Sequence, residues 1–162
     1  MSETSSTALR PPNLHVLLTT VSSDSHTWNL VYLQLLLEEL GCQVTNLGAC
    51  VPDALLIDEV RRIRPDAVVC STVNGHGHID GARMIRWLRA DPDPAVATIP
   101  VIIGGKLGIA GDRDPELLAE LLEAGFTTVF TDQARPEDLD LALGRLQPGT
   151  AGRPRAALAG AR

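Results

Sequence analysis

The chain lacks an excess of basic residues. Its 14 lysines and arginines are outnumbered by 20 aspartates and glutamates, which gives a formal net charge of −6 at pH 7. A protein whose main partner is a nucleic-acid backbone needs the opposite balance, because it must neutralise phosphates. The last arginines, Arg153, Arg155 and Arg162, lie in a run rich in Gly, Ala and Pro that is typical of a solvated tail. The composition therefore argues against a nucleic-acid partner.

Cysteine is scarce, and long apolar runs are missing. Cys42, Cys50 and Cys70 form no Cys-x-x-Cys pair, which favours free thiols in a reducing compartment over disulfides. No run approaches the length of a membrane span, and residues 1–12 show no charged start followed by an apolar stretch of signal-peptide length. These absences predict a cytoplasmic protein with no membrane partner.

The apolar content is sufficient for one core. Hydrophobic residues make up 44% of the 162 residues, so one substantial domain is expected, whereas two would be cramped. We place this domain at residues 13–147. A disordered lead is expected at residues 1–12, and a disordered Gly/Ala/Arg-rich tail at residues 148–162.

Short apolar runs alternate with amphipathic segments along the domain. Strands are predicted at 14–19, 43–47, 67–71, 101–104 and 127–130, helices at 28–40, 52–64, 79–89, 115–124 and 136–146, and a proline-rich loop at 91–100. Parallel strands need crossover helices, and these crossovers are right-handed. The pattern predicts an α/β fold: a doubly wound, flavodoxin-like, five-stranded parallel sheet of order 2-1-3-4-5 with helices on both faces.

Three loops with unusual residues, at 22–29, 71–80 and 104–113, follow strands that are neighbours in this order. They should therefore meet at the carboxyl edge of the sheet, where ligands bind in such folds. In the first loop Asp24 stands two residues before His26. A carboxylate that accepts a proton from one imidazole nitrogen makes the other a better metal ligand. The pair is a candidate metal site, and a solvated surface histidine is the alternative.

The other two loops carry small and polar residues. Gly75 would let the backbone approach a bulky group, and the pair Gly104 and Gly105 either forms a tight turn or gives clearance to a flat ring. His76 and His78 alternate on a glycine loop without a Cys or Glu partner in sequence, which does not favour zinc. Contact with a ligand rim or a partner subunit, or plain solvent exposure, remains open for them.

Taken together, these residues resemble a known family. Asp24, His26, Ser71, Val73, Gly104 and Gly105 follow the order and nearly the spacing of an Asp-x-His-x-x-Gly, Ser-x-Leu and Gly-Gly pattern. This pattern is typical of cobalamin-binding domains that bind the cofactor with its lower base displaced by histidine. The chain resembles most the small cobalamin-binding subunit of glutamate mutase, also called methylaspartate mutase, over roughly residues 14–146.

The resemblance implies adenosylcobalamin as cofactor, with His26 as the lower ligand of cobalt and Asp24 bonded to the other ring nitrogen. Ser71 would lie beside the base of the nucleotide tail. Lys106 and Arg113 either meet the cofactor's phosphate or face water. The residues implied in cofactor binding are Ser23, Asp24, Ser25, His26, Thr27, Trp28, Asn29, Ser71, Val73, Gly75, Gly104, Gly105, Lys106, Thr131 and Asp132.

By the same resemblance this chain contributes no catalytic residue. It would hold the corrinoid for a separate, barrel-type catalytic subunit, and the assembly would be an isomerase that rearranges the carbon skeleton of glutamate or a related amino acid by radical chemistry. The substrate and partner are implied by the family alone.

The chain departs from the family pattern at Asn29, which stands where the family has glycine, after the bulky Trp28. Asparagine tolerates positive φ and is a competent helix N-cap, so we expect the backbone shape to survive with less side-chain clearance near the corrin. A second departure, an insertion at 91–100, should lie on the opposite loop edge.

Three other functions share this fold or cofactor. A corrinoid carrier for methyl transfer usually has a helical cap before the domain, and a cobalamin-based light sensor or repressor needs an output domain. A receiver domain needs a phosphorylatable aspartate at the end of the third strand, where this chain has Cys70 and Ser71.

Overall fold

The computed structural model describes residues 13–108 and 115–146. In this part of the chain five strands form one parallel sheet of order β2-β1-β3-β4-β5. The strands are β1 His15–Thr20, β2 Gln43–Asn46, β3 Ala67–Thr72, β4 Val101–Gly105 and β5 Thr128–Val129. The predicted fold class and strand order are confirmed. The expected lead, the expected tail and Arg113 lie outside the described residues.

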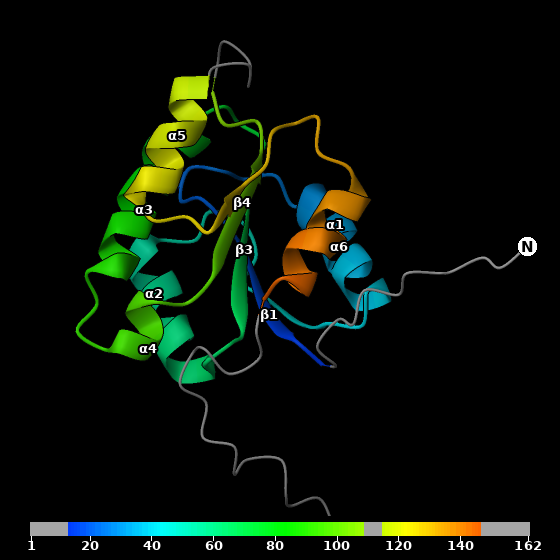
Figure 1. Cartoon of the computed structure of the whole chain (residues 1–162), viewed down its shortest axis with the longest axis horizontal. Coiled ribbons are helices and arrows are strands. Elements are labelled where there is room, and N and C mark those ends of the chain that lie inside the picture. Colours follow the sequence, from blue (N-terminus) through cyan, green and yellow to red (C-terminus); the bar gives the residue numbers. More distant parts are fainter. Residues whose placement is uncertain (1–12, 109–114, 147–162) are drawn as a thin grey trace, which may run out of the picture.

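Helices cover both faces of the sheet. They are α1 Trp28–Glu39, α2 Asp53–Ile63, α3 Gly77–Arg89, α4 Pro94–Ala97, α5 Pro115–Ala124 and α6 Pro136–Gly144. Figure 1 shows α1 and α6 on one face, and α2 to α5 on the other. We call these the α1/α6 face and the α2–α5 face. None of the helices within the described ranges has the length and apolar character needed to cross a membrane.

The prediction of an uninterrupted loop at 91–100 is wrong, because α4 lies within it. The Asp93 carboxylate accepts a hydrogen bond from Ala95 N at 2.9 Å, and Pro94 begins the helix. An aspartate N-cap accepts a hydrogen bond from a backbone N–H of the first turn that has no partner within the helix. The proline that follows fixes φ near its helical value. This local signal explains why a single helical turn forms in a proline-rich segment.

Strand alternation divides the core between the two faces. In β1, Leu17 packs with the α2–α5 face, whereas Val16 and Leu18 pack with the α1/α6 face. All six residues of β1 and all six of β3 are buried. A sheet with helices on both sides buries both rows of side chains, so such strands are continuous apolar runs in sequence. This is the pattern on which the strand predictions relied.

The parallel register brings the carboxyl ends of the central strands level. Thr20 of β1 is paired with Ser71 of β3, and Ser71 is paired with Gly104 of β4. The loops that follow these strands therefore begin side by side, although they lie far apart in sequence. The edge they share is where the candidate site is built.

Candidate functional site

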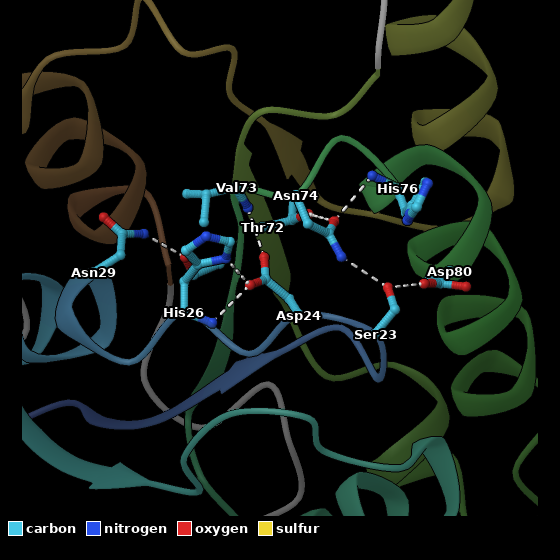
Figure 2. Close-up of polar contacts among 10 residues, drawn as sticks. Ser23, Asp24, His26, Asn29, Thr72, Val73, Asn74, His76 and Asp80 are labelled. Carbon is cyan, nitrogen blue, oxygen red and sulfur yellow. Dashed lines mark hydrogen bonds and ion pairs between the residues drawn. The ribbon is translucent and has the colours of Figure 1, made fainter.

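The Asp24 and His26 side chains form the centre of the loop after β1. His26 Nδ1 lies 2.7 Å from Asp24 Oδ1, and the imidazole is 48% exposed while the carboxylate is fully buried. Figure 2 shows the ring next to the buried carboxylate. Because a carboxylate only accepts, Nδ1 carries the shared proton and the lone pair of Nε2 is available to a ligand.

Asp24 is held as a carboxylate by its surroundings. Burial raises the pKa of its carboxyl group, but hydrogen bonds from Val73 N at 2.6 Å, His26 N at 3.0 Å and the His26 ring outweigh burial and lower the pKa. Hydrogen bonds to the charged form stabilise it. Asp24 therefore remains ionised at neutral pH and joins the loop after β1 to the loop after β3.

A second set of contacts fixes the same two loops to α3. Asn74 Nδ2 donates to Ser23 Oγ at 2.9 Å, and Ser23 Oγ donates to Asp80. Arg83 bonds both Asp80, at 2.9 Å, and Asp53, at 2.6 Å. The Ser23, Asn74 and Asp80 contacts are visible in Figure 2. This network orders the loop that carries His26.

Asn29, the residue that departs from the family pattern, contacts Ser71. Its Nδ2 donates to Ser71 Oγ at 2.5 Å, from the first turn of α1 to the end of β3. Ser71 is only 3% exposed. The amide therefore covers the hydroxyl that the family resemblance places beside the cofactor's nucleotide base.

A pocket of about 290 Å³ lies between the sheet and helices α1 and α6. Of the predicted site residues, Asn29, Gly104, Gly105, Thr131 and Asp132 line it. The remaining lining residues were not predicted from the sequence; they are Tyr32, Leu33, Leu36, Val69, Cys70, Ile102, Phe130, Ala134, Arg135, Pro136 and Leu139. Three of these, Tyr32, Leu33 and Leu36, share one face of α1 by helical spacing, which was the available signal.

The glycine pair at the pocket wall has a structural reason as well as room for a ligand. Gly105 has φ +111°, and a Cβ there would lie 2.0 Å from the carbonyl oxygen of Thr72. A Cβ on Gly104 would come within 3.1 Å of Phe130 Cβ. The backbone therefore requires glycine at 105, and Gly104 keeps this part of the wall free of side-chain atoms.

The other predicted residues occupy the same edge of the sheet. Gly75 adopts φ +83° in the loop after β3. Lys106 N donates to the Thr72 carbonyl at 2.7 Å. Ser25, Thr27, Trp28 and Lys106 are exposed at this edge, as are Ser23, His26 and Asp132. The structure thus gives two groups: the hydrogen-bonded loop around Asp24, and the pocket beside Asn29.

The remaining histidines do not join His26. His78 Nε2 lies 2.5 Å from Glu120 Oε2, and His76 N donates to Asn74 Oδ1 at 2.9 Å. Across residues 13–108 and 115–146, no group of three or more His, Cys, Asp or Glu side chains could hold a metal ion. A single imidazole suits a metal whose other positions are filled by a macrocycle, as with an axial histidine of haem.

Comparison with known proteins identifies the family of this chain. Residues 14–137 match the B12 binding domain family model, and the chain belongs to this family of cobalamin-binding domains. It is similar to the glutamate mutase sigma subunit of Halobacterium salinarum, with 32% identity over 119 residues that cover 73% of this chain and 76% of the relative.

Two further matches are to a transcriptional repressor and to a solved structure. The HTH-type transcriptional repressor CarA of Myxococcus xanthus is 34% identical over 95 residues, which cover 59% of this chain and 32% of the repressor. The crystal structure of a cobalamin-binding protein from Desulfitobacterium hafniense superposes with a TM-score of 0.64 at 21% identity, covering 83% of this chain and 59% of that one. The latter likeness concerns the fold.

Proposed function

We propose that this chain is the cobalamin-binding small subunit of an adenosylcobalamin-dependent mutase that rearranges the carbon skeleton of glutamate or a related amino acid. The observation that carries the proposal is the pair of Asp24 and His26, which presents Nε2 at the carboxyl edge of the sheet next to a pocket. The sigma subunits among its relatives support the mutase role.

The residues present fit the cofactor. His26 Nε2 would bind cobalt in place of the cofactor's own base, and the displaced nucleotide tail would enter the pocket between the sheet and the α1/α6 face. Thr131 and Asp132 would line its far side, and Lys106 would lie near the phosphate. When bound, adenosylcobalamin supplies an organic radical by homolysis of its cobalt–carbon bond.

The residues of this chain would hold the cofactor and orient the histidine that binds it. Asp24 keeps the proton on His26 Nδ1. This fixes the ring orientation and makes the lone pair of Nε2 a better ligand for a metal. Ser23, Asn74 and Asp80 hold the loop in place, so that little ordering remains to be done on binding. The chemistry on the substrate belongs to a separate, barrel-type catalytic subunit.

An exposed apolar stripe supports docking of that subunit. Trp28, Val31, Tyr32 and Leu35 recur at helical spacing on α1 and are 49% to 68% exposed. The stripe begins two residues after His26. A partner that covers the carboxyl edge of the sheet, where the cofactor would bind, can therefore bury the stripe as well. Contiguous exposed apolar surface is typical of interaction sites. A cytoplasmic location and the expected order of lead, domain and tail complete the proposal.

The match to a repressor favours a second candidate, a cobalamin-sensing module. The two candidates differ in the response to a catalytic subunit. A mutase subunit gains isomerase activity on glutamate when it is mixed with a barrel-type subunit and adenosylcobalamin, whereas a sensor module gains none.

The first experiment tests cofactor ligation. Purified protein is mixed with adenosylcobalamin or methylcobalamin, free corrinoid is removed, and the absorption spectrum is recorded. The electron paramagnetic resonance spectrum of the cob(II)alamin form is then compared for protein with and without nitrogen-15 in its histidines. We expect retained corrinoid with an axial signal that changes with the label. The variant His76→Ala is the matched control, because His76 is another exposed histidine at this edge. No retention, or a signal indifferent to the label, would contradict the proposal.

A further inference from the structure

Thr20 is a buried polar residue that the site described above does not use. It is the last residue of β1 and is 2% exposed. Among the residues that the structure describes, its Oγ1 is the buried side-chain polar atom without a hydrogen-bond partner. Buried hydroxyls in native proteins are normally paired, because an unpaired one costs free energy. A valine would fill nearly the same volume without that cost.

The sheet places Thr20 in line with the pocket. Thr20 is paired with Ser71, and Ser71 with Gly104, across three neighbouring strands. Side chains two residues apart share a face of a sheet, so Thr20 follows Leu18 onto the α1/α6 face. Ser71 follows Val69 in the same way, and Gly104 lines the pocket itself. The two hydroxyl residues therefore lie in one row with Gly104, just beyond the residues that line the pocket, on the side toward β1.

These two hydroxyls supply donors that lack acceptors. Ser71 Oγ accepts a hydrogen bond from Asn29 Nδ2, which leaves its own O–H to donate. Within 13–108 and 115–146 the structure records no acceptor for that proton, and none for the Thr20 hydroxyl. A ligand that completes this end of the pocket must bring an acceptor. A ring nitrogen with a free lone pair is such a group, and it belongs to a flat heteroaromatic base that can pass a wall made by glycine.

We propose that Thr20 is a ligand-binding residue, which forms with Ser71 a hydroxyl pair that donates to the ring nitrogen of a heteroaromatic nucleotide base. Asn29 covers Ser71 and gives up its bond to that hydroxyl when the base enters. The inference rests on the proposed function, since the base belongs to the nucleotide tail of the corrinoid. It adds a residue from β1 to the part of the site that recognises the tail.

The test compares two corrinoids that differ only in the tail. Dissociation constants of adenosylcobalamin and of adenosylcobinamide, which lacks the nucleotide, are measured for the unmodified chain and for Thr20→Val. We expect the variant to bind adenosylcobalamin about tenfold more weakly, since a buried hydrogen bond is lost, and to bind adenosylcobinamide unchanged. Its melting temperature should stay equal or rise, because an unpaired hydroxyl has been removed.

The matched control is Thr19→Val. Thr19 is the neighbouring residue of β1, is fully buried, and donates to the carbonyl oxygen of Thr20 at 3.2 Å. Its side chain lies on the opposite face of the sheet by strand alternation. We expect this variant to leave the ratio of the two dissociation constants unchanged, whatever it does to stability.

The outcomes separate the two proposals. If the unmodified chain binds neither corrinoid, the proposed function is overturned and this inference with it. If the chain prefers adenosylcobalamin and Thr20→Val keeps that preference, the inference alone is wrong. A lower melting temperature for Thr20→Val also overturns it, because the hydroxyl would then have a partner within the protein. Equal affinity of the unmodified chain for both corrinoids would show that the tail is not recognised here.

Discussion

The two faces of the sheet differ in how completely side chains fill them. On the α2–α5 face, Ile85 and Leu88 of α3, Val96 of α4 and Leu121 of α5 are fully buried against the strands. On the α1/α6 face the apolar core is closed near the amino ends of the strands, whereas a pocket opens beside Gly104. The sheet therefore has a completely packed core on one side and a pocket that can bind a ligand on the other.

This difference divides stability from function. Close packing transmits any change in volume as a loss of stability, so the α2–α5 face holds the sheet and the loops in place. The α1/α6 face has the exposed apolar stripe on α1 and an unpaired buried hydroxyl, and binding of a ligand or partner would offset the free-energy cost of both. Variants on the two faces should therefore affect different measurements.

The largest effect is expected from His26→Ala, which removes the proposed cobalt ligand. Histidine ligation should be abolished, and the nitrogen-15 dependence of the cob(II)alamin spectrum should disappear. Because the ring is about half-exposed, unfolding free energy should change by no more than about 1 kcal/mol. An unchanged spectrum in this variant would remove His26 from the site.

A pair of core variants tests the contrast between the faces directly. Ile85→Ala, on the α2–α5 face, should cost about 2–5 kcal/mol of unfolding free energy, because Ile85 is fully buried in a packed core. Leu36→Ala, at the wall of the pocket, should cost less than about 2 kcal/mol, because fewer contacts are lost. Denaturant unfolding of both variants measures this, and equal costs would contradict the difference between the faces.

Asp24→Asn should weaken cobalamin binding by about 10- to 100-fold, because the residue that orients the histidine loses its charge. The variant should also change how the free energy of unfolding depends on pH in the acid range. The pKa of Asp24 is lowered in the folded protein, so its ionisation stabilises the fold above the ordinary aspartate pKa, and this contribution is lost as the pH falls through the folded pKa. The stability difference between the two proteins should shrink on acidification; a constant difference would contradict this account.

The smallest effect is expected from Asn29→Gly. Removal of the amide uncovers Ser71, so adenosylcobalamin should bind a few-fold more tightly, whereas α1 should lose up to about 1 kcal/mol from the glycine. Gln34→Ala, another amide on α1 that bonds Glu38 and Asn46, is the control for a lost side-chain bond on this helix. Weaker binding by Asn29→Gly would show that the amide contacts the ligand instead of covering its site.

Much of this architecture could be predicted from local patterns. Runs such as 67–71 identified strands because both faces of a covered parallel strand are apolar, and Asp24 two residues before His26 predicted the hydrogen bond that is present at 2.7 Å. The helical turn α4 was missed although Asp93 and Pro94 carried its signal. The roles of the predicted site residues in cofactor binding stay predictions.

Other features had no signal in the sequence. The contact between Asn29 and Ser71 joins residues 42 positions apart. Phe130, which lines the pocket, follows β5, the strand at one edge of the sheet. Such pairs depend on register and on where each helix rests, which periodicity does not specify. For the same reason the sequence does not distinguish Thr20 from other threonines, since the lack of a hydrogen-bond partner for its hydroxyl depends on the residues packed around it.

The sequence by itself determined the alternation of strands and helices, the parallel sheet and the loop that carries Asp24 and His26, because these follow from the spacing of apolar residues and from near neighbours in the chain. Only the tertiary structure decided that Thr20, Ser71 and Gly104 form one row, that Asn29 covers Ser71, and that the α1/α6 face opens into a pocket. The physical reason is that strand pairing and helix packing set distances between residues that the chain keeps far apart, and hydrogen-bond donors and acceptors can be counted only once those distances are known.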